Sequence, residues 1–180
     1  MSLIECRNRI QKGIEEAGQS MLKTMAETEG VLALDSGVCF HLLDAGPNPG
    51  DGLRPSSAST VKVHYHGTLP DGTIFDSTLG QTDPVTFAVG QVIPGYKEGL
   101  LKMHEGETAM IGIPASMAYG DMGSGDGRIP GGCAVFFKVQ LIEVMTAGIG
   151  GAPTLLGVDG KKLKKEENAG GLLGADGKPL

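Results

Sequence analysis

The sequence lacks the features that mark membrane proteins and nucleic-acid-binding proteins. It has no apolar run near the roughly 18–20 residues that a helix needs to span a bilayer. Its 15 Lys and Arg stand against 21 Asp and Glu, for a net charge of −6, and an acidic chain is a poor candidate for binding nucleic acid or an anionic membrane. The N-terminal stretch carries charges where a signal peptide needs apolar residues. We therefore expect a cytoplasmic protein that binds neither nucleic acid nor membrane.

Cysteine and metal-binding patterns are scarce as well. Cys6, Cys39 and Cys133 are widely spaced and have no metal-ligand spacing, so we expect reduced thiols. Cys39 and Cys133 lie in apolar runs and are expected in the core. His64 and His66 have the i, i+2 spacing that can hold a metal on a strand, but no third ligand is nearby in the sequence. No local motif marks a nucleophilic triad or dyad, so we predict neither a metal site nor a cofactor.

Glycine, in contrast, is abundant, with 30 of 180 residues against an average share of about 7%. Many glycines without a collagen period favour a turn-rich β architecture over a helix bundle. Composition divides the chain into an N-terminal amphipathic helix and linker (1–36), a strand-rich domain (37–145) and a Gly/Lys-rich tail (146–180). The tail holds a short repeat, 155–163 and 172–180, which predicts either a flexible tail or two small hairpins.

The N-terminal part has apolar residues at helical spacing. They are Leu3, Ile10, Ile14, Ala17, Met21 and Met25. This stripe predicts an amphipathic helix that either packs on its own domain or serves as a dimerising arm.

The middle part alternates short apolar segments with turn residues. Strands are predicted over 38–43, 60–66, 73–76, 85–89, 108–114 and 134–144, and one short helix over 96–101. In the second strand, Val61, Val63 and Tyr65 share one face, and Lys62, His64 and His66 share the other. One sheet folded around one short helix makes this an α+β domain.

Aromatic residues are few, and they gather near the ends of these segments. Only eight Phe and Tyr are present, without Trp, and six of them belong to a set with aliphatic neighbours: Tyr65, Phe75, Phe87, Val92, Ile93, Tyr96, Tyr119, Ile129 and Phe137. The set forms either the ordinary core or a shallow apolar cup with a few polar donors.

Several motifs in register carry a family resemblance. They are Val63-His64-Tyr65-x-Gly67-x-Leu69-x-Asp71-Gly72-x-x-Phe75-Asp76-Ser77, Val92-Ile93-Pro94-Gly95-Tyr96, Ala118-Tyr119-Gly120, Ile129-Pro130 and Val135-Phe136-Phe137. Over residues 37–145 the chain resembles the FKBP-type peptidyl-prolyl isomerases. The junction 29–38 is similar to that of macrophage-infectivity-potentiator-like members, in which an N-terminal helical region mediates dimerisation.

The resemblance implies a five- to six-stranded antiparallel half-barrel wrapped around the short helix, with a proline pocket between them. The implied catalytic residues are Tyr65, Phe75, Asp76, Ile93, Tyr96, Tyr119 and Phe137, and the implied ligand contacts are Val85, Val92 and Ile129. Tyr96 would form the floor, and the Ile93 N–H and Tyr119 hydroxyl would bond peptide carbonyls. Two positions depart from the family: Val85 stands where an aromatic is common, and Gln81 near a position often held by Arg.

The function that the resemblance implies is cofactor-free isomerisation of X–Pro bonds in peptides and proteins, which assists protein folding. Tacrolimus or rapamycin would be further ligands of the same pocket. Two alternatives stay open from the residues: a module that binds proline peptides or macrolides without turnover, and a scaffold that acts through its helix and tail.

Overall fold

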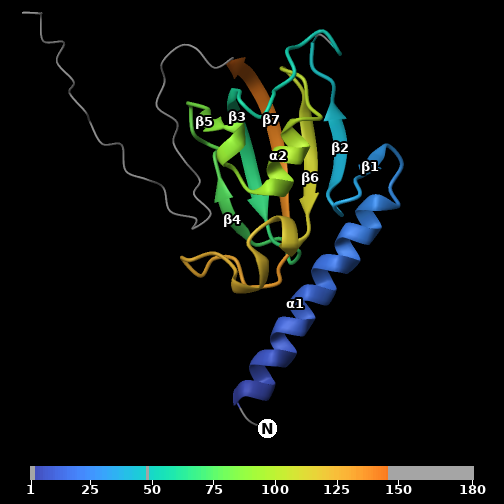
Figure 1. Cartoon of the computed structure of the whole chain (residues 1–180), viewed down its shortest axis with the longest axis vertical. Coiled ribbons are helices and arrows are strands. Elements are labelled where there is room, and N and C mark those ends of the chain that lie inside the picture. Colours follow the sequence, from blue (N-terminus) through green and yellow to red (C-terminus); the bar gives the residue numbers. More distant parts are fainter. Residues whose placement is uncertain (1–2, 48, 146–180) are drawn as a thin grey trace, which may run out of the picture.

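A computed structural model describes residues 3–47 and 49–145 of the chain (Figure 1). A long helix, α1 (Leu3–Ala26), precedes an antiparallel sheet that carries a short helix, α2 (Pro94–Leu100), on one face. The predicted α+β class is therefore confirmed. The tail with its repeat lies outside the described residues, and the proposed boundaries between the three parts stay predictions.

The sheet of the described residues has seven strands, and all of its pairings are antiparallel. The strands are β1 (Val31–Ala33), β2 (Cys39–Asp44), β3 (Thr60–Thr68), β4 (Ile74–Ser77), β5 (Val85–Ala88), β6 (Thr108–Ile113) and β7 (Val135–Met145). Their order is β1-β2-β6-β7-β3-β4, with β5 on the same edge of β3 as β4. Three short 3-10 turns complete the fold: Val89–Gln91, Ala115–Met117 and Gly120–Met122.

The count exceeds the expected five to six strands because β1 forms in the predicted linker. Leu34 donates its N–H to the Val38 carbonyl at 2.8 Å, and Gly37 takes a φ of +84° between them. That positive φ suits glycine and closes a tight hairpin, so the linker pairs with β2.

Alternation along β3 sets which side chains face the core, as predicted. Val61, Val63 and Tyr65 are buried, whereas Lys62 and His64 are half-buried on the opposite face. The next turn is also as expected. Leu69 donates its N–H to the Thr73 carbonyl and accepts the Gly72 N–H, and β4 begins directly afterwards at Ile74.

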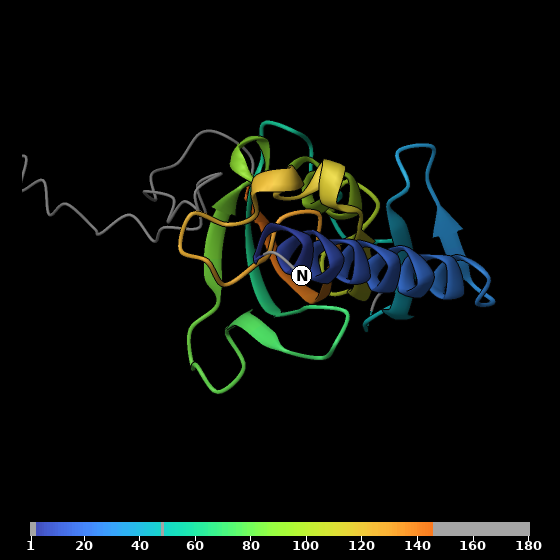
Figure 2. The same ribbon diagram turned by 90° about the horizontal axis from the view of Figure 1, so that it is seen from below.

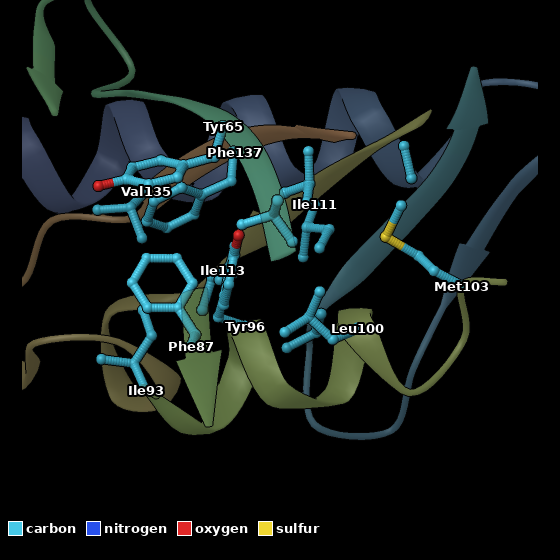
Figure 3. Close-up of a cluster of buried hydrophobic side chains, with 14 of the residues drawn as sticks. Tyr65, Phe87, Ile93, Tyr96, Leu100, Met103, Ile111, Ile113, Val135 and Phe137 are labelled. Carbon is cyan, nitrogen blue, oxygen red and sulfur yellow. The ribbon is translucent and has the colours of Figure 1, made fainter. Parts of the chain in front are cut away.

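Two glycines let α2 approach the sheet closely, and Figure 3 shows the helix lying over the buried side chains of the sheet. A Cβ on Gly95 would lie 2.2 Å from Ile113 Cγ2, and one on Gly99 would lie 2.4 Å from Ile111 Cδ1. Neither distance leaves room for a methyl group. The short helix is therefore held against β6, and its last residue, Leu100, is fully buried.

Helix α1 packs on the opposite face of the sheet, where Leu22 joins a buried cluster with Cys39, Ala134 and Phe136. The predicted stripe is only partly right. Ile14 and Met25 are half-buried as expected, and Leu3 is not described beyond its backbone. Ala17 is exposed, and so are Ile10 and Met21, at 60% and 42% of their surface.

The helix is rotated from the predicted face because Gly18 makes the close contact. A Cβ on Gly18 would lie 2.9 Å from the Ala134 Cβ, so the helix approaches through its smallest residue and Leu22 follows one turn later. Although α1 has 24 residues, no helix in the described ranges combines the length and the apolar character needed to cross a membrane.

Candidate active site

Five aromatic rings from five elements meet at one end of the core, and Figure 3 shows Tyr65, Phe87, Tyr96 and Phe137 among them. Phe137 on β7 is their centre, with ring centroids 4.9 Å from Tyr96 on α2, 5.4 Å from Phe75 on β4 and 6.2 Å from Tyr65 on β3. Phe87 on β5 lies 5.6 Å from Tyr65 and 6.4 Å from Tyr96. Tilted and edge-on contacts of this kind are favourable for aromatic pairs, so the rings form a fixed apolar wall.

Two small hollows open beside this wall and share Tyr119 and Phe137. The first is lined by Tyr65, Val92, Ile93, Tyr96, Tyr119 and Phe137. The second is lined by Phe75, Asp76, Tyr119, Ser124, Asp126, Arg128, Ile129 and Phe137. We call the first the apolar pocket and the second its rim.

The structure thus brings together nine of the ten predicted site residues, which come from strands, α2 and two loops. Val85 is the exception, since it packs half-buried against the core and lines neither hollow. The predicted roles of these residues stay predictions, because position alone does not test them.

Besides the buried hydroxyl of Tyr96, two hydrogen-bond donors at the apolar pocket have no acceptor within the described residues. One is the backbone N–H of Ile93, the residue before α2, whose own carbonyl accepts the Lys97 N–H. The other is the hydroxyl of Tyr119, which follows the 3-10 turn after β6. Unpaired donors beside an apolar cavity are suited to peptide carbonyls of a ligand.

The carboxylate of Asp76 organises the polar side of the pocket. Its Oδ2 accepts the Tyr65 hydroxyl at 2.5 Å, and its Oδ1 accepts the backbone N–H of Ser77 at 2.9 Å. Burial, followed by this hydrogen bond, raises the pKa of Tyr65 well above its ordinary value. Burial and the Asp76 charge also raise the pKa of Tyr119 to about 12, so both tyrosines keep their protons at neutral pH.

A guanidinium reaches the rim from a loop that the sequence did not single out. Arg128 donates to the Phe75 carbonyl at 3.4 Å and lies 3.3 Å from Asp126. Gln81, near the position where relatives often have Arg, is exposed and its backbone bonds only to Thr78. The rim cation therefore comes from a different segment, and only its place beside Ile129 could have pointed to it.

The two histidines of β3 lie on the outer face of the sheet, away from this pocket. The Nδ1 atoms of His64 and His66 lie 3.2 and 2.9 Å from the hydroxyls of Thr78 and Ser77. Both rings line a larger hollow of about 380 Å³ with Lys138. Across residues 3–47 and 49–145, no three His, Cys, Asp or Glu side chains gather as a metal site would require.

Comparisons with known proteins agree with this geometry. The model of the FKBP-type peptidyl-prolyl cis-trans isomerase family matches residues 52–142. Outer membrane protein MIP of Legionella longbeachae is 41% identical over 130 residues, covering 72% of this chain and 54% of that protein. Peptidyl-prolyl cis-trans isomerase FKBP2 of Bos taurus is 39% identical over 127 residues, covering 69% and 86%.

The crystal structure of FkpA from Escherichia coli has a TM-score of 0.71 at 31% identity, covering 78% of this chain and 63% of that one. The chain spans about half the length of some curated relatives, such as 46% of FkpA from Aeromonas hydrophila. The segment that matches the family model contains every residue of the pocket and its rim. This chain belongs to the FKBP-type peptidyl-prolyl cis-trans isomerase family.

Proposed function

We propose that the protein catalyses the cis–trans isomerisation of X–Pro bonds by binding the proline non-covalently in the apolar pocket. The observation that carries the proposal is the pairing of an aromatic cavity with two unpaired donors, the Ile93 N–H and the Tyr119 hydroxyl. Amide resonance opposes rotation by about 18–20 kcal/mol. An X–Pro bond has nearly balanced isomers but interconverts over tens to hundreds of seconds, so there is a slow step for an enzyme to accelerate.

The apolar wall would favour the twisted amide over the planar one. Rotation removes the C–N double-bond character, which leaves a less polar carbonyl and a more basic nitrogen. A pocket lined by Tyr65, Tyr96 and Phe137 solvates the polar planar amide poorly, whereas the less polar twisted amide needs less solvation. The pocket would therefore bind the twisted amide more favourably than the planar one. Catalysis then needs neither a nucleophile nor a cofactor.

The donors would hold the flanking peptide while the bond turns. The Ile93 N–H and the Tyr119 hydroxyl would each donate to a peptide carbonyl, and the high pKa of Tyr119, about 12, keeps that proton in place. Asp76, fixed by Tyr65, would lie at the rim beside the twisting amide. Fixing the substrate in this way converts ordinary binding energy into orientation.

A protease-coupled assay on an X–Pro peptide tests the proposal, with Phe75→Ala as the variant. Phe75 is buried and its ring packs edge-on against Phe137, so its loss opens the pocket and abolishes turnover. The matched control is Ile74→Ala, the neighbouring residue on β4, which is 57% exposed. Circular dichroism verifies that both variants fold, and wild-type turnover from folded Phe75→Ala would sink the proposal.

A gentler variant tests the Tyr119 donor, and turnover by the wild-type chain separates the enzyme from a pure binding module. Tyr119→Phe removes one hydroxyl and keeps the ring, so kcat/KM should fall roughly two- to tenfold, the value of one hydrogen bond. If the wild-type chain binds proline peptides or tacrolimus and shows no turnover, the binding module is correct. Turnover that tacrolimus blocks supports both the enzyme and macrolide binding in the same pocket.

A second copy of the chain is the proposed partner of α1. Ile10 and Met21 remain exposed beside the face that packs on the sheet, and their spacing fits a helix–helix seam. Light scattering on the whole chain tests this, since Ile10→Glu should reduce a dimer mass to that of one chain. A monomeric wild type would contradict it. The cytoplasmic location stays a prediction from the sequence.

A further inference from the structure

One segment, 119–132, contributes residues to both the apolar pocket and its rim, and we call it the rim loop. It begins at Tyr119, contains Arg128 and Ile129, and leads into β7. Six of its 14 residues are glycine, and glycine leaves the backbone more conformations than any other residue. A loop of this composition needs fixed contacts to present Tyr119 and Ile129 in one geometry.

Helix α1 supplies such contacts from outside the pocket. Figure 2 shows its N-terminal half passing beside the loop that leads into β7. The side-chain amide of Gln11 donates to the Gly131 carbonyl. One turn later, a Cβ on Gly132 would lie 2.5 Å from Glu15 Oε1, and Gly18 meets Ala134 just beyond the loop. Two positions on one helix face, Gln11 and Glu15, therefore touch the C-terminal end of the rim loop, and Gly18 on the same face packs just beyond it.

The rim loop is folded back on itself, so that a hydrogen bond connects its C-terminal end, which α1 contacts, to its N-terminal end beside Tyr119. Gly132 donates its N–H to the Gly120 carbonyl at 2.8 Å, next to Tyr119. Ser124 binds Ile129 twice, through a backbone N–H to its carbonyl and a hydroxyl that accepts its N–H, both at 2.9 Å. Gly132, which α1 touches, is thus bonded to the residue after Tyr119, and Gly131 lies two residues after Ile129.

Few contacts make up this junction. A hollow of about 230 Å³ separates the helix from the first part of the loop, and its lining includes Glu15, Ser116 and Asp121. The helix therefore contacts the loop only locally. Among the described residues, the side-chain hydrogen bond that joins α1 to the loop is the one that the Gln11 amide donates to Gly131.

We propose that α1 braces the rim loop and that Gln11 is a positioning residue for the proline pocket. Through Gly131, it holds Tyr119 and Ile129 in the geometry that grips the substrate. The effect on kcat/KM rests on the proposed isomerase function, whereas the contact between α1 and the rim loop does not depend on that function. Small displacements of positioning groups have large effects on rates, so a contact outside the pocket can set the activity within it.

Two measurements on the full chain test the brace, with Gln11→Ala as the variant. Hydrogen exchange should speed up at the amides of Gly127, Ile129 and Gly132, which are bonded inside the rim loop. In the isomerase assay, kcat/KM should fall roughly two- to tenfold, mainly through KM, while Tm stays near that of wild type. The control is Lys12→Ala, whose ammonium faces solvent beside Glu16, and it should change neither readout.

A conservative variant distinguishes positioning from a general loss of packing. Gln11→Lys keeps a donor of similar reach and should restore part of both effects. Unchanged exchange in Gln11→Ala would overturn the brace, and faster exchange with unchanged kcat/KM would overturn the positioning role. If the wild type itself shows no turnover, the proposed function fails, while the exchange data still decide the brace.

Discussion

Replacing Tyr96 with Phe is expected to stabilise the protein, although Tyr96 lines the apolar pocket. Its side chain is 3% exposed, and its hydroxyl has no hydrogen-bond partner among the described residues. Figure 3 shows this hydroxyl pointing from α2 toward the sheet, among apolar side chains. Burial raises the pKa of Tyr96 far above its ordinary value, so the hydroxyl stays neutral but unsatisfied.

The size of the effect follows from the environment of that one oxygen. A buried hydroxyl without a partner costs roughly 1–3 kcal/mol in mutational data. Phe keeps the ring and its contact with Phe137 at 4.9 Å between centroids. We expect a gain of about 1–2 kcal/mol in the free energy of unfolding, or about 2–8 °C in Tm for a chain of this size.

Urea denaturation measures this gain, and Tyr65→Phe is the matched control. The Tyr65 hydroxyl is in the same aromatic cluster but bonds to Asp76 at 2.5 Å, so its removal should destabilise the fold by roughly 1.5–3 kcal/mol, as for hydrogen bonds to charged groups. The two substitutions should therefore have opposite signs. If Tyr96→Phe lowers stability instead, the hydroxyl has a partner and the reasoning from burial is wrong.

Three further predictions concern other parts of the molecule. Glu107→Ala should cost about 2 kcal/mol in urea denaturation, because the buried carboxylate accepts the His104 N–H at 2.7 Å and lies 3.1 Å from its Nδ1; unchanged stability would contradict this. Activity should show no Tyr119 titration below about pH 10, because its pKa is raised to about 12. An alkaline loss below that pH which vanishes in Tyr119→Phe would contradict it. Iodoacetamide should alkylate exposed Cys6 well before buried Cys133, whose pKa burial raises to about 11; peptide mass spectrometry reads the order, and equal rates would refute it.

The local pattern of the sequence was enough to predict most strands and the short helix. Period-two alternation in β3 placed Val63 and Tyr65 inward because only the pleat and burial decide that face. The strand β1 was missed because three residues are too few for a periodic signal, and its pairing depends on a turn at Gly37. A short strand that forms only because it pairs with another segment cannot be predicted from the local sequence pattern.

The face of α1 was misjudged for a different physical reason. Hydrophobicity favoured Ala17 and Met21, yet the helix touches the sheet through Gly18, which has no side chain to count. A glycine contributes to packing because it lets a neighbouring segment come close to the backbone, so its role depends on that neighbour, which here is Ala134. No hydropathy pattern contains that information.

The candidate site divides in the same way between local and long-range information. The residues of the aromatic wall stood out because aromatic residues are few and lie near segment ends, which left both a core and a cup open, and the family resemblance assigned them to a pocket. The free N–H of Ile93 depends on where α2 begins, and the rim cation on how far the Arg128 loop folds back toward Phe75. Residue types could be predicted, whereas unpaired donors and cross-loop contacts needed the coordinates.

Two adjacent residues of β7 connect the outer helix to the pocket through the sheet. Phe136 packs with Leu22 of α1 on one face, and Phe137 is the centre of the aromatic wall on the other. Successive side chains of a strand point to opposite faces, and close-packed interiors transmit small shifts instead of absorbing them. We therefore expect a displacement of α1 to reach Phe137 through β7, as well as Tyr119 through the rim loop. Pairing of two copies through α1 would restrain both routes at once, and the proposed dimer would then be physically coupled to the proposed activity.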